Sequence, residues 1–216
     1  MARRTPPGTG NVPVVFRFQP PSPCPFVDLR GEMSHFQQIN PMTQRGSGEV
    51  EQTLFLETGV FAYKFYGGGQ NWWLDPHNHR TRSRNGARNN ILVIGGTDEP
   101  VLHAPARPFL FVQDSGSVCV RAGLRKGSFH SLSVLWDEGE GHRQTPLHIV
   151  ASEDEHLLLE AYLPTSAQRF HYAFVLPNDQ LVGRQGGAGQ MFSVERKDIT
   201  PAAPDWWRTA VVYTVF

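Results

Sequence analysis

Residues 61–65 read Phe-Ala-Tyr-Lys-Phe, and residues 170–174, which begin 109 positions later, read Phe-His-Tyr-Ala-Phe. An aromatic side chain occupies every second position in both stretches, and this spacing is typical of a β-strand with one buried face. A turn-forming segment follows each stretch, Gly-Gly-Gly-Gln-Asn at residues 67–71 and Pro-Asn-Asp-Gln at residues 177–180. The matching order predicts that the chain contains two copies of one β-structural unit.

The rest of the chain continues this alternation over short runs. Apolar residues occupy alternate positions, and so share one inward face, in segments 14–18, 54–56, 118–120, 157–159 and 192–194. The chain has 21 glycines and 17 prolines, spread along its length as the tight turns between short antiparallel strands require. We therefore expect an all-β protein.

The spacing of the two copies predicts two tandem antiparallel β-sandwiches of ordinary domain size. A polar, turn-forming link, Gly-Gly-Thr-Asp-Glu-Pro at residues 95–100, marks the expected boundary between them. We expect a disordered leader at residues 1–11 and a first domain at residues 12–97. A second domain at residues 98–198 and a terminal segment at residues 199–216 follow.

Charge and composition exclude several classes of protein. Lys plus Arg and Asp plus Glu both number 20 among the 216 residues, so the chain lacks the basic excess that marks nucleic-acid and anionic-membrane binders. The sequence shows no apolar run near the length of a spanning helix and no signal-peptide core. Cys24 and Cys119 fall in different expected domains, so we expect two reduced thiols and a cytoplasmic protein.

Four segments of the first expected domain resemble carbohydrate-binding module family 48, the glycogen-binding type of domain. They read Gly-Glu-Met-Ser-His-Phe at 31–36, Tyr-Lys-Phe at 63–65, Trp-Trp-Leu-Asp-Pro at 72–76 and Asn-Asn-Ile at 89–91. Their order and spacing agree with the family, whereas Phe36 stands where the family often has a tryptophan. The resemblance implies an immunoglobulin-like, early-set β-sandwich that binds α-glucans.

The second expected domain is similar to carbohydrate-binding module family 34, the N-terminal module of neopullulanases and maltogenic amylases. The similar residues are His103, Val-Arg-Ala at 120–122 leading to Lys126, and the stretch at 169–174. Residues 204–216, Pro-Asp-Trp-Trp-Arg-Thr-Ala-Val-Val-Tyr-Thr-Val-Phe, resemble the entry into the (β/α)8 barrel of glycoside hydrolase family 13. This resemblance implies a catalytic barrel of which the chain carries only a truncated first strand, with every catalytic residue on later strands.

A binding site for an α-glucan needs a flat aromatic ring for the C–H face of a sugar and polar groups for its hydroxyls. Alternation along residues 61–66 directs Lys64 to the outer side of its strand, and consecutive tryptophans in an extended segment point in opposite directions. The family resemblance assigns Trp72 as the exposed ring and Trp73 as a core residue. Asparagine carboxamides and a second aromatic ring complete the candidate carbohydrate-binding set, which is Trp72, Lys64, Asn90, Asn89, Phe36 and Trp73.

Each candidate also has a purely structural interpretation. Trp72 could pack in the core, as most tryptophans do, and Lys64 could be a solvated charge at a sheet edge. The two asparagines could satisfy the backbone of their own turn. Phe36 could join Met33 and Ile39 in an apolar core staple.

The remaining polar segments have simpler interpretations. Four arginines close to the tryptophans are expected to lie in a solvated loop, because the net charge of zero argues against a nucleic-acid patch. They are Arg80, Arg82, Arg84 and Arg88. Residues 153–155, Glu-Asp-Glu, are expected to form an acidic turn. His77 and His79 lack a third ligand, so no metal site is expected.

The sequence therefore predicts a non-catalytic region that binds starch, glycogen or maltodextrin and presents it to a barrel of the same parent chain. The parent is expected to be a glycosidase that acts on α-1,4 or α-1,6 glucans. No nucleophile motif, catalytic carboxylate pair or cofactor motif is present, so no catalytic residue and no cofactor are assigned. The expected partners are an α-glucan, the barrel and, by resemblance, a second copy of the chain, with neither nucleic acid nor membrane. The alternative is a structural or dimerisation module that positions the barrel and binds no sugar.

Overall fold

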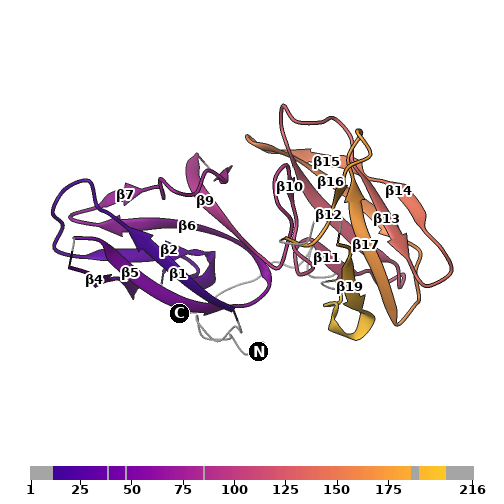
Figure 1. Cartoon of the computed structure of the whole chain (residues 1–216), viewed down its shortest axis with the longest axis horizontal. Helices are drawn as coiled ribbons and strands as arrows, with labels where there is room; N and C mark the ends of the chain where they lie inside the picture. Colours follow the sequence, from indigo (N-terminus) through magenta and orange to yellow (C-terminus); the bar gives the residue numbers. More distant parts are fainter. Residues whose placement is uncertain (1–11, 38, 47, 85, 186–189, 203–216) are drawn as a thin grey trace, which may run out of the picture.

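The computed structural model describes residues 12–37, 39–46, 48–84, 86–185 and 190–202. Strands form nearly all of the regular structure in these ranges and lie in two halves (Figure 1). The strands of the first half are β1 (Val12–Phe18), β2 (Val27–Gly31), β3 (Asn40–Pro41), β4 (Thr43–Gln44), β5 (Val50–Leu56), β6 (Gly59–Gly67), β7 (Asn71–Trp73), β8 (Thr81–Arg84) and β9 (Ala87–Ile94).

The second half begins just after the predicted link. Its strands are β10 (Val101–Leu102), β11 (Leu110–Val112), β12 (Val118–Arg125), β13 (Ser133–Asp137), β14 (Arg143–Pro146), β15 (His148–Ser152), β16 (His156–Leu163), β17 (Arg169–Val175), β18 (Leu181–Val182) and β19 (Phe192–Glu195). Within the described ranges the helical elements are two short 3-10 helices, η1 (Glu32–Ser34) and η2 (Arg196–Asp198). The expectation of an all-β protein is confirmed.

The strands form four small antiparallel sheets. In the first half the sheet orders are β1-β5-β4 and β3-β2-β6-β9-β8, and β7 also pairs with β6. In the second half they are β10-β12-β16-β15, with β11 on β12, and β14-β13-β17-β18, with β19 on β17. The four small sheets are an arrangement of the four-bladed propeller type, so the prediction of two tandem immunoglobulin-like sandwiches is wrong. Alternation reveals that a strand has one buried face, but it leaves open which strands join the same sheet.

The two aromatic stretches occupy equivalent strands, β6 and β17. Phe65 of β6 pairs with Trp73 of β7. Phe174 of β17 pairs with Val182 of β18, and each of these two residues lies 109 positions after its counterpart. The flanking strands correspond as well, because β2 lies beside β6 as β13 lies beside β17. The predicted duplication is therefore confirmed in the strand register.

Each half has its own hydrophobic core. In the first half, side chains of both sheets meet, and the rings of Phe18 and Phe65 stack with centroids 4.3 Å apart. In the second half, the alternate residues Phe170, Tyr172 and Phe174 of β17 are fully buried against the neighbouring sheet. Burial of aromatic side chains contributes more apolar area per residue than any other choice, which is why these strands form the centre of each core.

A third apolar cluster joins the two halves. We call the side of the sheet β3-β2-β6-β9-β8 that faces away from the first-half core its outer face. Ala62, Ile91 and Val93 on this outer face pack with Leu102 and Phe109 of the second half. The contact covers only one end of the outer face, and the other end is left open to solvent.

Charged side chains of the first half complete this joint. The guanidinium of Arg82 donates two hydrogen bonds to the carboxylate of Glu153, one of them 2.6 Å long between Nε and Oε2. Ser83 donates its N–H and its hydroxyl to Glu155 at 2.6 and 2.7 Å, and Arg88 lies 3.8 Å from the same carboxylate. Arg82 therefore faces the acidic turn of the second half instead of lying in the expected solvated loop, whereas the side chain of Arg88 is 59% exposed and that of Arg84 lies outside the described residues.

Arg80 holds the connector between the halves. Its guanidinium donates to the carbonyl oxygens of Thr97 and Val101 at 2.9 and 3.0 Å and to the carboxylate of Glu99 at 3.2 Å. Burial lowers the pKa of Arg80 from its usual value, although the charge of Glu99 acts in the opposite direction. The polar groups of this connector are thus bonded within the protein, as buried backbone requires.

The structure tests several smaller expectations. Cys24 and Cys119 are both free thiols, as expected, and burial raises the pKa of Cys119 to about 12. Within the described ranges, neither helix has the length or hydropathy needed to cross a membrane. The expected leader at residues 1–11 and the tail at residues 203–216 lie outside the described residues.

Candidate functional site

The open end of the outer face presents the side chains that the alternation of β6 directs away from the core. Tyr63 and Phe65 are buried, whereas the alternate residues Lys64 and Tyr66 lie on the outer face. This confirms the predicted orientation of the strand. Directly opposite residues of an antiparallel pair share a face, so Trp72, which pairs with Tyr66, lies on the outer face as well.

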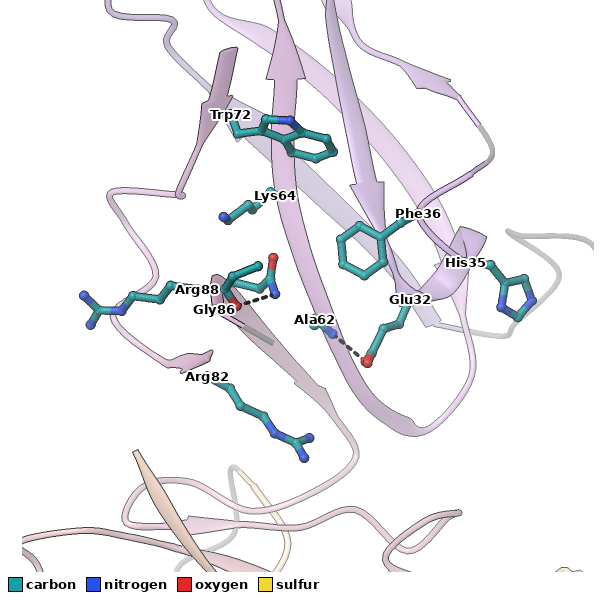
Figure 2. A pocket seen from close by; sticks show the side chains of 11 residues that line it. Glu32, His35, Phe36, Ala62, Lys64, Trp72, Arg82, Gly86 and Arg88 are labelled. Atoms are coloured by element: carbon teal, nitrogen blue, oxygen red, sulfur yellow. Dashed lines mark hydrogen bonds between the residues drawn. The ribbon is translucent and has the colours of Figure 1, made fainter. Parts of the chain in front are cut away.

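A pocket of about 770 Å³ lies over this open end (Figure 2). Its lining brings together four of the six predicted residues, and Figure 2 shows the ring of Trp72 over the strand that carries Lys64 and the ring of Phe36 beside this strand. The four are Phe36, Lys64, Trp72 and Asn89. Its volume falls in the range of small-molecule sites in proteins. Because these four residues come together from four separate segments of the chain, this pocket is the candidate site.

Trp72 is held at the pocket by the short strand β7. The turn before it uses left-handed backbone at Gly68, Gly69 and Gln70, with φ of 53°, 83° and 85°, a conformation that glycine adopts without steric cost. The indole is 48% exposed and tilts against Tyr66, with ring centroids 4.8 Å apart and planes at 52°. A large ring left half in solvent beside a second ring is an unusual use of tryptophan, which normally buries.

Trp73 and Asn90 lie behind the pocket rather than in it. Trp73 packs in the first-half core with its ring 5.6 Å from Phe18, as predicted for the second of two consecutive tryptophans. Asn90 is buried, and its carboxamide donates to the carbonyls of Asp75 and Asn78 at 3.2 and 2.7 Å and accepts the N–H of Asp75 at 2.7 Å. Its polar atoms are thus already bonded, and they position the loop that follows the tryptophans.

Phe36 reaches the pocket through a strained turn. His35 and Phe36 both have positive φ, 53° and 56°, directly after η1. Two consecutive non-glycine residues in this region are rare and cost of the order of 1–3 kcal/mol each, and such strain gathers at functional sites. Met33 packs in the first-half core and Ile39 is exposed, so the alternative of a common staple of these residues with Phe36 is wrong.

The polar groups of the pocket differ in how far they are already engaged. The ammonium group of Lys64 makes no hydrogen bond or ion pair with any residue that the structure describes. Asn89 donates from Nδ2 to the carbonyl of Ala87 at 3.3 Å, and its side chain has no other bond within the same described ranges. Glu32 accepts the N–H of Ala62 through Oε2 at 2.9 Å. The pocket therefore offers an ammonium donor and a carboxamide oxygen to a neutral polar ligand.

Sequence reasoning did not find Glu32, Arg82 or Arg88 as pocket residues. Glu32 could have been noticed, because it stands within the segment that carries the family resemblance. Arg82 and Arg88 belong to the arginine run. Their carboxylate partners, Glu153 for Arg82 and Glu155 for Arg88, lie about 70 positions later in the chain. No pattern in the sequence links segments so far apart.

The described residues show no arrangement for catalysis or metal binding. No group of three His, Cys, Asp or Glu side chains in the described ranges is close enough together to hold a metal ion. Among the described residues that line the pocket, Glu32 is the one carboxylate, so the pair of carboxylates used in acid–base chemistry is not formed there.

No family model and no curated protein matches the chain. Among solved structures, it is similar to a crystal structure of maltogenic amylase from S. marinus, with 19% identity and a TM-score of 0.44 over 92% of this chain and 31% of that chain. It is also similar to a DUF3823 family protein from Bacteroides ovatus ATCC 8483, with 10% identity and a TM-score of 0.28 over 81% of this chain and 90% of that chain. The chain thus spans less than a third of the length of the maltogenic amylase, and these values assign no residue of the site.

Proposed function

We propose that this chain is a non-catalytic region that binds α-glucans, such as starch, glycogen or maltodextrin, in the pocket formed by Phe36, Lys64, Trp72 and Asn89. The observation that carries the proposal is the half-exposed indole of Trp72, which lines a pocket that also contains the ammonium group of Lys64, for which no described residue is a partner. Asn90 and Trp73 serve the site indirectly, because they fix the loop and the strand that present Trp72.

The chemistry of a glucose ring fits this pocket. One face of the ring consists of C–H groups and packs on an aromatic plane, while its rim of hydroxyl groups needs donors and acceptors. Trp72 and Phe36 offer the planes, Lys64 offers up to three donors, and Asn89 offers an acceptor. A neutral ligand also suits the pocket, because Glu32 places a carboxylate beside the cations.

The sequence resemblance supports the class of ligand and its setting. The segments at 31–36, 63–65, 72–76 and 89–91 resemble a glycogen-binding module, and each of them contributes at least one residue to the pocket. The tail at 204–216 resembles the entry to an α-amylase-type barrel. We propose on this ground that the parent enzyme acts on α-1,4 or α-1,6 glucans and that the chain, in the cytoplasm, presents substrate to its barrel.

Replacement of Trp72 by alanine tests this function. We expect the wild-type chain to bind maltoheptaose with a dissociation constant of about 0.1–1 mM, which corresponds to about 4–5.5 kcal/mol. Trp72→Ala removes the stacking plane and should weaken binding at least tenfold, measured by calorimetry and by retention in native gels that contain glycogen. Phe55, which is 49% exposed on β5 and does not line the pocket, provides the matched control Phe55→Ala. Equal retention of wild type and Trp72→Ala, with native circular dichroism for both, would disprove the assignment.

A second function is favoured by the charged joint between the halves. The pairs that Arg82 and Ser83 make with Glu153 and Glu155 hold the first half against the second and suit a module that positions a barrel or a second copy of the chain. Such a module would need no sugar. Sedimentation equilibrium distinguishes the two functions, since a concentration-dependent mass without any glucan binding would favour the positioning role.

A further inference from the structure

The candidate pocket is one part of a longer groove. A neighbouring pocket of about 390 Å³, lined in part by Arg30 and Tyr66, shares Phe36 and Trp72 with it. A second neighbour of about 440 Å³ lies on the other side and shares Glu32 and Arg82 with the candidate pocket. Three hollows that share wall residues in succession run from Tyr66, past Lys64, into the space between the two halves of the molecule.

The far end of this groove is lined by both halves. Glu32, Val60 and Arg82 of the first half line one wall there. The opposite wall comes from β12, β15, β16 and the segments beside them, and includes Arg121, Val150, Glu153 and Leu158. Val150 is 51% exposed on the edge strand β15. The end is therefore partly apolar, with polar groups at its margin, which is the same combination that Trp72 and Lys64 provide at the near end.

The charges at the far end are already paired. Arg82 is bonded to Glu153, and Arg121 donates from Nε to Glu160 at 2.7 Å while its guanidinium stands 4.8 Å from the ring centroid of Phe111. Little excess positive charge remains for a phosphate backbone, which argues against a nucleic acid. A neutral, extended chain with many hydroxyl groups meets both ends of the groove without displacing these pairs.

We propose that a linear α-glucan binds along the whole groove, so that sugar units beyond those on Trp72 contact the second half at Val150 and Arg121. The inference rests on the proposed function and specifies its ligand as a chain longer than the candidate pocket alone accommodates. It also gives the joint a role, because the ion pair between Arg82 and Glu153 sets the width of the groove at the passage from one half to the other.

Affinity as a function of chain length tests this inference on the full chain. We expect wild type to bind maltoheptaose at least fivefold more tightly than maltotriose in titration calorimetry. Val150→Arg places a large charged side chain in the far end, and Val150 lies at a bulge outside the core, so the fold should tolerate it. This variant should lose most of the fivefold gain and bind maltotriose as wild type does. Ile149→Arg is the matched control, because Ile149 is equally exposed, at 54%, but does not line the groove.

The outcomes separate this inference from the function on which it rests. If Val150→Arg binds maltoheptaose as tightly as Ile149→Arg does, the glucan does not reach the second half, and the inference fails while the site at Trp72 stands. If wild type binds neither oligosaccharide, both proposals fail together. Loss of maltotriose binding in Val150→Arg would also contradict the inference, since the near end should be unaffected.

Discussion

His103 is a fully buried polar side chain close to the connector between the halves. Its ring is fully buried among the aromatic side chains of Phe109, Phe174 and Phe192. Nδ1 lies 2.7 Å from the carbonyl of Arg121, which can only accept, so Nδ1 carries the proton and Nε2 accepts the hydroxyl of Tyr172 at 2.7 Å. Burial lowers the pKa of His103 to about 3, and the bond to the Arg121 carbonyl opposes this only in part.

This histidine should make the stability of the protein depend on pH. The unfolded chain binds a proton at His103 below pH 6.5, whereas the folded chain does so only near pH 3, so falling pH stabilises the unfolded state. The loss sets in below pH 6.5 and amounts to about 1.4 kcal/mol per pH unit, or about 4 kcal/mol by pH 3.5. His103→Gln should flatten this part of the profile of unfolding free energy against pH, measured with urea, whereas His130→Gln at an exposed position should not. An unchanged slope in His103→Gln would rule out this linkage.

Single residues also show what sequence reasoning can and cannot supply. The opposite orientations of Trp72 and Trp73 followed from strand geometry, which depends only on neighbouring positions. The burial of Asn90 could not be derived in this way, because its partners at Asp75 and Asn78 are set by how a loop folds back. A carboxamide looks the same in a sequence whether it meets a sugar or a backbone carbonyl.

At the scale of elements, the edge strand β8 is protected by the acidic turn of the second half. Glu155 accepts both the N–H and the hydroxyl of Ser83, and these bonds hold the pKa of Glu155 below its usual value although burial acts to raise it. An edge strand leaves unpaired backbone groups that invite other chains, and a carboxylate from a second segment covers one of them here. The turn thus covers part of the β8 edge and joins the halves.

Removal of this carboxylate should weaken the joint. Glu155→Ala leaves the N–H of Ser83 without its partner, and we expect a loss of about 1–2 kcal/mol in the free energy of unfolding. Asp154→Ala changes the neighbouring exposed acid and should cost little, which makes it the control. Urea unfolding of both variants provides the measurement, and equal stabilities would contradict a role for Glu155 in the joint.

Elements were predicted more reliably than their assembly. The alternation at residues 61–65 and 170–174 identified β6 and β17, and the equal offset of their partners confirmed the duplication. Which strands share a sheet was not predictable from those patterns, since a strand buries one face in a sandwich and in a set of four small sheets alike. The expected division of the chain at residues 97 and 98 stays a prediction.

At the scale of the whole molecule, the two copies of the repeat have diverged in their outward side chains. Ala173 of β17 stands at the position of Lys64 and is buried, and Leu181 of β18 stands at the position of Trp72. One copy has an aromatic ring and a cation at these two positions, whereas the other lacks both. This asymmetry explains why a groove that starts on the first half would use the second half as a wall rather than as a second stacking site.

The carboxylate–guanidinium contacts across the joint should make the contact between the halves depend on ionic strength. Their side chains are partly exposed, about 21% for Arg82 and 22% for Glu153, and the Debye length shrinks from about 10 Å in 0.1 M salt to about 3 Å in 1 M. Screening should let the halves swing apart about the apolar contact of Leu102 and Phe109, so the radius of gyration from small-angle scattering should rise with added sodium chloride. The gain in affinity for maltoheptaose over maltotriose should fall as the salt concentration rises, while maltotriose binding at Trp72 persists. A long-chain preference that is the same in 0.1 and 1 M salt would mean that screening leaves the interdomain angle unchanged.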